Sequence, residues 1–544
     1  MKSAVAFPTA ERFVFHLLLA ANLVPLWAFQ YFLTCDGPCH LYNAKVLLDF
    51  WQGGEPKAFY ETWLYLNTRF EPNWFGHAFM TLLMGLQIPA FLAEKLLQTV
   101  YVLAFGLGLR YLIQQINPSN LFLSSFGLLF AHHYVFQMGF YNYSCSLAAM
   151  FWATGYWLHI RRGYAPGQLL VLAIGLLVLY FCHPVGLLFT LLLIGSLLVG
   201  DFWNDTRAHK RDKINWQKFG QAMAAIAVAT LPVVVLFAEY LFFKGINATP
   251  RGEPTSALWH LLRENRGLLI MDISERWWAV AVAVACALMA LHAAYNKLKN
   301  KDRRWTDALL GVFLFTVWLY FNQPGSVAGG GITPLRLVLL PYLTLILWLA
   351  STYFSIKLKR AVLVFSVVVS AAFLTLRFPH YKMANEAVQE YASCAAVIPN
   401  YATVLPISFN HHGQIGSGRY VAEAIWLFVH AGDYVGVDKH IVLLGNYEAH
   451  TRNFPLVWRE GRNPFVLLSK DGDYFEEQPP RADILGLPDK TGGAHVDYVV
   501  TWCKDQRFQD HPYTQEINQQ LEQGYDLIFI SEHGLAKVFK RKGI

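Results

Sequence analysis

Long apolar runs alternate with short polar segments between residues 12 and 377 of this 544-residue chain. A bilayer core about 30 Å thick is crossed by roughly 20 apolar residues in a helix. Runs such as Phe219–Phe243, Trp277–Ala294 and Ala361–Leu376 meet or approach that length. After His380, apolar and polar residues are mixed as in a soluble protein. The pattern predicts an α-helical polytopic membrane protein that ends in a soluble domain.

The apolar runs predict about eleven transmembrane helices. The first lacks a small-x-small cleavage site and many others follow it, so we interpret it as a retained helix and not as a signal peptide. The long polar loop 34–90 then contains two amphipathic stretches, His40–Phe50 and Trp74–Leu86, which we expect to be juxtamembrane helices. The predicted spans are 13–33, 91–113, 120–138, 143–160, 168–182, 185–203, 219–243, 277–296, 305–321, 335–353 and 361–377.

Basic residues are grouped in alternate linkers between these spans. If the N-terminus is cytoplasmic, every dense basic cluster is cytoplasmic, and the opposite short loops 139–143 and 182–185 carry no Lys or Arg. This is the positive-inside distribution of a membrane protein, so we do not interpret the net charge of +7 as a nucleic-acid-binding surface. We predict a multi-pass protein of the cytoplasmic (inner) membrane. The clusters are Arg110, 161–162, 207–213, 297–304 and 357–360.

An odd number of spans places residues 378–544 on the outer, periplasmic side. This region contains short β-like runs between helical stretches, which predicts an extracytoplasmic α/β domain. We therefore divide the chain into a transmembrane domain, 1–377, and a C-terminal domain, 378–544. The predicted strands are Ala402–Phe409, His440–Gly445, Phe465–Ser469, Tyr498–Trp502 and Leu527–Ser531, and the predicted helices are Ala384–Val397, Tyr420–His430 and Glu516–Gln523.

Composition agrees with this division and limits the chemistry. Hydrophobic residues make up 55% of the chain and charged residues 15%, against about 25% charged in a typical soluble domain. The seven cysteines form no CxxC pair, which argues against a zinc site. Cys35–Cys39 and Cys394–Cys503 could be disulfides if they face an oxidising compartment, or free thiols. The chain has no Walker or GxGxxG motif, which argues against ATP-driven transport.

Asp36 is the first candidate for chemistry. Residues 34–40 read Thr-Cys-Asp-Gly-Pro-Cys-His, so a carboxylate lies within a turn of the end of the first span. Gly37-Pro38 favours a turn that holds it there. A carboxylate in this place must be solvated, paired or metal-bound. The alternative is that Asp36 only caps the helix at His40–Phe50 or ends a turn.

Other rare polar residues are predicted to lie on the same outer face. Ionisable residues at membrane depth usually mark function or pair with one another, although each could instead anchor a span or close a turn. Arginine and lysine could hold a lipid phosphate, histidines could hydrogen-bond that phosphate or ligate a divalent metal, and a carboxylate could take a proton from an attacking group. The candidates are His40, Arg69, Lys95, His132, His133, Asn142, His183 and Arg336.

The chain resembles the GT-C superfamily of integral membrane glycosyltransferases. The resemblance covers the layout of a first span, a long outer loop with juxtamembrane helices, many spans and an outer C-terminal domain, and one motif, Asp36-Gly-Pro-Cys-His40. It implies transfer of a sugar from a polyprenyl-phosphate or diphosphate carrier to an extracytoplasmic glycan, lipid or protein, with Asp36 as general base. Many members carry acidic metal ligands in the second outer loop. Here 132–143 contains none, so a divalent metal such as Mg or Mn is left open.

Two other function classes fit the same pattern. A lipid or solute transporter or flippase would favour inverted repeats and polar residues at the bilayer midplane, whereas this chain has no repeat and its polar residues lie toward one face. A non-catalytic membrane scaffold with an external partner-binding domain would tolerate substitution of Asp36, His183 and Arg336.

Overall fold

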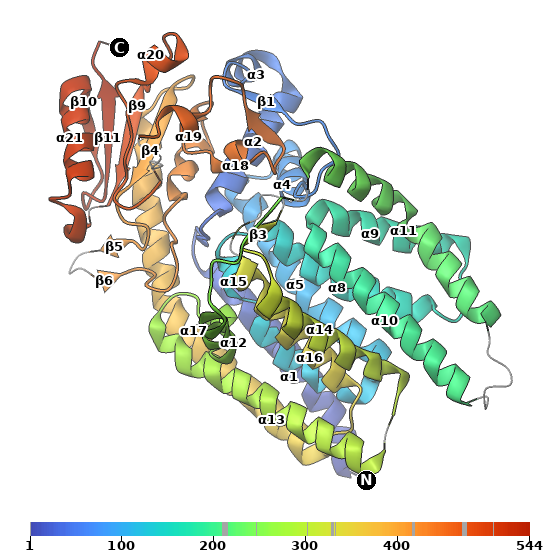
Figure 1. Ribbon diagram of the computed structural model, residues 1–544. Helices are drawn as coiled ribbons and strands as arrows, with labels where there is room; N and C mark the ends of the chain where they lie inside the picture. The colour runs from blue at the N-terminus through green and yellow to red at the C-terminus, as the bar shows by residue number, and fades with distance from the viewer. Residues whose placement is uncertain are drawn as a thin grey trace.

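The structure is a computed structural model of the chain. It describes residues 2–208, 216–245, 247–301, 303–327, 331, 333–415, 419–470, 476–503 and 505–543. Long helices run side by side through most of the molecule, and a mixed β-sheet lies at one end of them (Figure 1). The N-terminus lies at the opposite end of the helices from this sheet (Figure 1).

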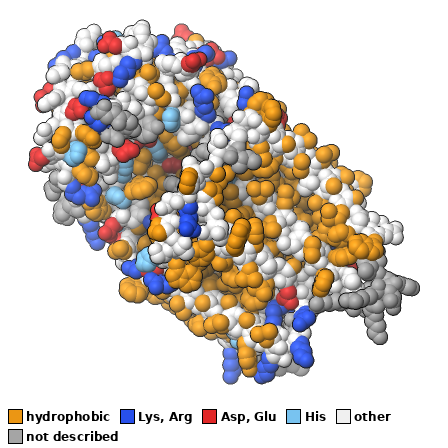
Figure 2. Space-filling model, viewed as in Figure 1, with side chains coloured by type: hydrophobic (Ala, Val, Ile, Leu, Met, Phe, Trp, Pro, Cys, Tyr) orange, Lys and Arg blue, Asp and Glu red, His pale blue; other side chains and the backbone are white. Residues whose placement is uncertain are grey.

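Within the described residues, seven helical segments are long and apolar enough to cross a membrane, so the chain is a helical membrane protein with several spans. Figure 2 shows the matching surface, a hydrophobic zone over the helices with charged side chains gathered at the two ends. These segments correspond to seven of the predicted spans. They contain α5 (Ala90–Ile116), α10 (Pro184–Ala208), α11 (Trp216–Lys244), α13 (Arg276–Asn300), α14 (Ala308–Asn322), α15 (Thr333–Leu337) with α16 (Leu339–Ala350), and α17 (Ile356–Ala392).

Three further predicted spans form the helices α1 (Lys2–Ala28), α8 (Tyr141–Ile160) and α9 (Pro166–Cys182). The prediction of one continuous helix over 120–138 is wrong. That segment contains two short α-helices, α6 (Phe122–Gly127) and α7 (Tyr134–Gln137), with a single 3-10 turn between them. The break occurs because His133 has an extended backbone and caps α7 with its own side chain, which accepts a hydrogen bond from the Phe136 amide.

The end of the helices at which the N-terminus of the chain lies carries basic residues from several linkers, and we call it the basic end. Arg161 pairs with Asp201 at 3.0 Å and lies over the Trp305 ring, and Arg110 pairs with Glu11. Contacts between these distant segments place their linkers together. The predicted basic cluster 207–213 lies largely outside the described residues. Which side of a membrane the basic end faces stays a prediction.

The C-terminal region forms a five-stranded mixed sheet in the order β10-β11-β9-β4-β7. β4 pairs in parallel with β7 and β9, whereas β11 pairs antiparallel with β9 and β10. Four of the five predicted strands are found in it. Its strands are β4 (Thr403–Ser408), β7 (Val442–Leu443), β9 (Tyr498–Trp502), β10 (Tyr525–Ile530) and β11 (Ala536–Arg541), and the helices of this region are α18 (Tyr447–Thr451), α19 (Pro464–Leu467), α20 (Leu487–Thr491) and α21 (Pro512–Gly524).

Two predictions for this region are wrong. Phe465–Ser469 is not a strand, because Asn463 caps α19 and Pro464 occupies its first turn. Tyr420–His430 is not a helix, because its backbone amides bond to distant carbonyls, such as those of Gly413 and Met271, instead of those four residues back.

The loop 34–90 packs between the helices and the C-terminal region. It contains α2 and α4, as predicted from its two amphipathic stretches, and also α3 and β1. β1 pairs antiparallel with β8 (Leu456–Trp458), so the first loop and the C-terminal region share a small sheet. The loop elements are α2 (Gly37–Gln52), α3 (Gly54–Tyr60), β1 (Leu64–Leu66) and α4 (Phe75–Gly85), and the remaining short elements are β2 (Ala248–Thr249), β3 (Ser326–Val327), α12 (Thr255–Arg263), β5 (Gln414–Ile415) and β6 (Arg419–Tyr420).

Candidate functional site

Asp36 occupies a fixed position at the start of α2. Its backbone amide donates to the Met138 carbonyl at 3.0 Å. The next residue, Gly139, has a φ of 83° and packs against the Asp36 backbone. A Cβ on Gly139 would lie 2.7 Å from the Asp36 nitrogen, so only glycine allows this approach. The Asp36 side chain makes no capping hydrogen bond to α2. The carboxylate is therefore not used as a helix cap and is available to the site.

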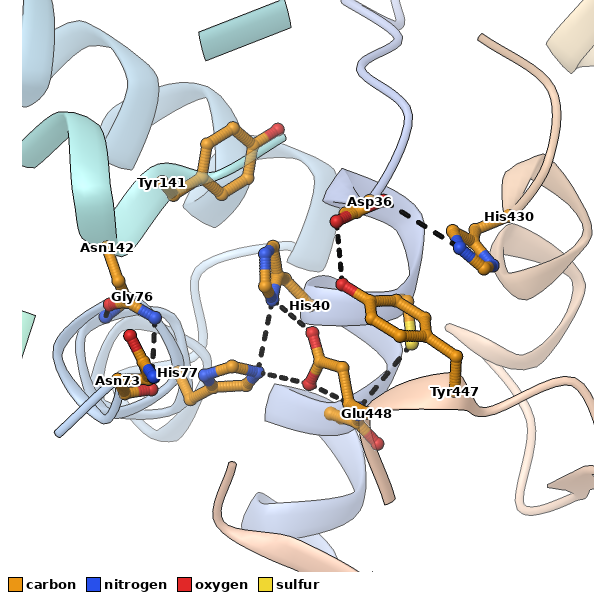
Figure 3. A network of polar contacts seen from close by, with 12 residues as sticks. Asp36, His40, Asn73, Gly76, His77, Tyr141, Asn142, His430, Tyr447 and Glu448 are labelled. Atoms are coloured by element: carbon orange, nitrogen blue, oxygen red, sulfur yellow. Dashed lines mark hydrogen bonds and ion pairs between the residues drawn. The ribbon is translucent and has the colours of Figure 1, made fainter. Parts of the chain in front are cut away.

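The Asp36 carboxylate faces the C-terminal region (Figure 3). Its Oδ2 accepts a 2.7 Å hydrogen bond from the Tyr447 hydroxyl, and its Oδ1 lies 3.7 Å from His430 Nε2. The rings of Tyr447 and His430 stack on each other at 4.3 Å. Burial raises the pKa of Asp36 to about 6, against the opposing influence of His40 and Tyr447. A carboxylate that titrates near neutral pH can accept and release a proton.

A second cluster lies beside it and joins three segments of the chain. His40 on α2, His77 on α4 and Glu448 on α18 are all buried. His40 Nδ1 lies 3.3 Å from His77 Nε2, which lies 2.8 Å from Glu448 Oε2, and His40 Nδ1 also contacts Glu448 Oε1. Asn43 donates to Glu448 Oε2 at 2.7 Å. We call His40, His77 and Glu448 the triad.

The charge on Glu448 is stabilised by the two histidines. Burial alone would raise the pKa of Glu448, but His40 and His77 hold it below its usual range. Burial likewise opposes ionisation of His40, and the Glu448 carboxylate raises the pKa of that imidazole. By contrast, burial lowers the pKa of His430 to about 3, so this imidazole beside Asp36 is neutral at physiological pH.

Asn142 places α4 against α8. Its Oδ1 accepts from the Gly76 amide at 2.7 Å and its Nδ2 donates to the Asn73 carbonyl at 3.0 Å (Figure 3). These bonds give both the oxygen and the nitrogen of the buried amide a partner. They also fix the first turn of α4, which carries His77. Asn142 therefore positions the triad instead of contacting Asp36.

Two further carboxyl groups, the buried Glu94 and the partly buried Glu476, lie beside the site. Glu94 accepts hydrogen bonds from the hydroxyls of Tyr141 and Tyr434 at 2.7 and 2.9 Å. Glu476 lies 3.5 Å from His430, and burial raises its pKa well above the usual range. Several acidic groups thus lie close to Asp36, which favours a cationic or proton-donating ligand.

Arg336 and His183 form a neighbouring group on the helix side of the site. The Arg336 guanidinium lies 4.5 Å above the Phe140 ring and within electrostatic range of Asp36 and Tyr447. The Arg336 carbonyl accepts a 2.5 Å hydrogen bond from Tyr143, whose ring packs against His183. Part of the Gly-rich loop before Arg336, at 328–330 and 332, lies outside the described residues.

The other four predicted residues have structural contacts elsewhere. The Lys95 ammonium bonds to the Phe29 carbonyl and lies near the Trp27 ring. Arg69 is exposed and stacks on Phe243 at 4.1 Å. His132 contacts the Asn22 carbonyl at 2.7 Å, and His133 caps α7. The structure therefore brings Asp36 and His40 into one cluster, with Asn142, His183 and Arg336 beside it, and leaves these four apart.

Sequence reasoning missed His77, His430, Tyr447 and Glu448. The signal for His77 was its place in the second amphipathic stretch of the loop that carries His40. The other three lie about 400 residues from Asp36, and nothing local distinguishes them from ordinary polar residues. All seven cysteines are buried and none forms a disulfide, so neither possible disulfide is present.

The site combines a proton acceptor, a potential metal-binding triad and a nearby guanidinium. Such a set can deprotonate a nucleophile and bind an anionic leaving group. Comparison with family models finds no match to this chain, and no curated protein matches it.

Proposed function

We propose that this protein is a glycosyltransferase that moves a sugar from a polyprenyl-phosphate or diphosphate carrier to an extracytoplasmic acceptor. The observation that carries the proposal is Asp36, a buried carboxylate at the start of the first long loop that caps no helix and lies among buried polar side chains. This position is the one that the GT-C resemblance assigns to the general base.

The donor would lie between the helices and the site. Arg336 supplies the cation for its phosphate. A cavity of about 250 Å³ between α5, α8 and α9 offers an apolar channel for the isoprenoid chain, and Phe75, two residues from His77, lines it. The headgroup of a lipid in this cavity would therefore come close to the polar residues. The other lining residues are Val100, Tyr101, Ala104, Cys145, Ala148, Ala149, Trp152, Ala153, Gly175, Val178 and Cys182.

The proposed step is a single displacement at the anomeric carbon. Asp36 takes the proton of an acceptor hydroxyl or amine as the acceptor heteroatom forms its bond to that carbon. The bond from the carbon to the phosphate oxygen breaks, and the polyprenyl phosphate leaves as an anion beside Arg336. Tyr447 and His430 hold the Asp36 carboxylate in place. A divalent metal, if bound by the triad, would add positive charge near the donor phosphate.

The topology belongs to the proposal as well. About eleven spans, with the basic end in the cytoplasm, place the site and the 378–544 domain on the outer side. Because every native cysteine is buried, Asp526→Cys on exposed β10 supplies one accessible thiol. Labelling of this variant in intact cells by a membrane-impermeant maleimide is expected, and labelling only after lysis would reverse the orientation.

The transfer itself is tested with membranes that contain the full chain. Radiolabelled polyprenyl-phosphate-linked hexoses, pentoses and aminosugars are supplied in turn, and label is followed into envelope glycans, lipids and proteins. We expect transfer from at least one donor, loss of transfer in Asp36→Asn, and wild-type transfer in Asp526→Asn. Full transfer by Asp36→Asn would remove Asp36 from the mechanism. Movement of the donor across liposomes without transfer would favour a flippase, and tolerance of all site substitutions would favour a scaffold.

A further inference from the structure

The triad brings three metal-ligand atoms together from three distant segments. His40, His77 and Glu448 each offer one nitrogen or oxygen, and these atoms lie within 4.8 Å of one another. All three side chains are at least 95% buried. Buried charged groups of this kind are paired or coordinate metals.

Protons alone do not satisfy the three contacts. His40 Nδ1 has two close polar neighbours, His77 Nε2 at 3.3 Å and Glu448 Oε1. His77 Nε2 has the same nitrogen and Glu448 Oε2 at 2.8 Å. If each nitrogen donates its one hydrogen to the carboxylate, both nitrogens are donors, and neither can accept a hydrogen bond across the contact between His40 and His77. A cation at the centre would satisfy both nitrogen lone pairs and the carboxylate together.

The spacing of the two histidine nitrogens also fits coordination. Bonds of about 2.0–2.1 Å in a tetrahedral site place neighbouring ligand atoms roughly 3.3 Å apart, and the two histidine nitrogens are 3.3 Å apart. The ligands are held from outside as well, because Asn43 donates to Glu448 and the Gly139 backbone hydrogen-bonds the His40 ring. Such outer contacts orient metal ligands.

We propose that His40, His77 and Glu448 bind one divalent transition-metal ion, with Zn²⁺ preferred to Mg²⁺. Two imidazoles and one carboxylate suit zinc and other transition metals, whereas magnesium prefers oxygen ligands. The ion joins α18 of the C-terminal region to α2 and α4 of the first loop. Because Tyr447 precedes Glu448 in the chain, the ion also fixes the tyrosine that donates to Asp36.

The test measures metal content and needs no enzymatic activity. Full-length protein is purified in detergent, stripped with a chelator, dialysed separately against Zn²⁺, Mn²⁺ or Mg²⁺, and analysed by mass spectrometry of the elements. We expect about one Zn²⁺ per chain and little Mg²⁺. Because outer contacts alone are worth 10–100-fold in affinity, His77→Gln and Glu448→Gln should each lower zinc affinity at least about 100-fold.

The matched control is His430→Gln, which removes a buried histidine beside Asp36 that is not part of the triad, and this variant should keep the zinc. The melting temperature gives a second reading: Zn²⁺ should raise it in the wild type and in His430→Gln, but not in His77→Gln. Wild-type protein that takes up no stoichiometric zinc would overturn the proposal, even if the variants fail to fold. So would triad variants that bind zinc as the wild type does. Neither result bears on whether the protein transfers a sugar.

Discussion

The fold stabilises two buried carboxylates, Glu275 and Glu448, with different kinds of partners. Glu275 accepts hydrogen bonds from the backbone amides of Ile270, Met271 and Asp272 and pairs with Arg377 at 2.8 Å. Its partners are permanent donors, and arginine keeps its charge in proteins. Glu448 is held instead by two histidines and an asparagine amide, and histidine changes its charge near neutral pH.

The difference distinguishes a charge that only stabilises the fold from a charge that can take part in chemistry. The Glu275–Arg377 pair ties the start of α13 to α17 and leaves no free coordination site. The triad uses side chains that can exchange protons or bind a cation, and it lies beside Asp36. A buried charge with saturated, fixed partners thus indicates architecture, whereas one with titratable partners indicates chemistry.

The largest expected effect is on folding and comes from Arg377→Met. It leaves Glu275 buried without its counter-ion, a change that typically costs about 3–5 kcal/mol. We expect a strongly lowered melting temperature and poor recovery of monodisperse protein in detergent. The exposed pair Lys382–Glu386 supplies the control, and Lys382→Ala should cost no more than about 0.5 kcal/mol. Equal stability of the two variants would mean that Glu275 is not held by its arginine.

Glu448→Gln should lower the stability less than Arg377→Met does, but it should strongly lower the transfer activity. The new amide can still accept from Asn43, and no ionised carboxylate is left unpaired, so we expect a loss of about 1–3 kcal/mol. Sugar transfer should fall at least tenfold, because Glu448 no longer holds His40 and with it the start of α2, where the Asp36 carboxylate lies. Thermal unfolding and initial transfer rates measure the two effects. A variant as damaged in folding as Arg377→Met would make the triad another structural pair.

The pH dependence of transfer should report Asp36. Its pKa of about 6 lies above the value of about 3.9 in an unfolded chain, so protonated Asp36 favours the fold and ionised Asp36 catalyses. The stabilising contribution is therefore present below about pH 4 and lost as pH rises through 6. Transfer should follow the opposite course and fall about tenfold per pH unit below 6.

Tyr447→Phe sharpens that prediction. The Tyr447 hydroxyl stabilises the ionised Asp36 carboxylate, so its removal should raise the pKa of Asp36. One hydrogen bond of about 1 kcal/mol corresponds to roughly 0.7 pH unit. The acid limb of the rate profile should shift upward by about that amount, with little change in the plateau rate. An unshifted limb would assign the titration to another group.

The smallest effect should come from Arg69→Gln. This arginine is exposed and stacks on Phe243, a contact worth about 0.5–1 kcal/mol at exposed sites. We expect nearly wild-type stability and transfer. A transfer defect larger than tenfold would bring Arg69 into the donor site, as the sequence alone suggested.

The sequence predicted the helical membrane class and the main strands because those depend on local patterns. Apolar length identified helices such as α11 and α13, and short β-like runs identified β4 and β9. It failed in two places. A local cap by His133 breaks the predicted span 120–138. The amides of 420–430 bond across the fold, so contacts between distant segments decide that region.

The site was only half predictable for the same reason. Asp36 and His40 lie in one short motif next to a span, where a carboxylate is conspicuous. Glu448 and Tyr447 come to them only because β8 pairs with β1 and carries α18 onto the first loop. No spacing in the sequence encodes that approach.

The most direct test of the central claim is a structure of the protein with a polyprenyl-phosphate-linked sugar bound. We expect the isoprenoid chain in the cavity between α5, α8 and α9, the phosphate beside Arg336, and the sugar next to Asp36, with room for an acceptor about 3 Å from the carboxylate. A donor bound at the basic end of the helices, or anywhere out of reach of Asp36, would contradict the account.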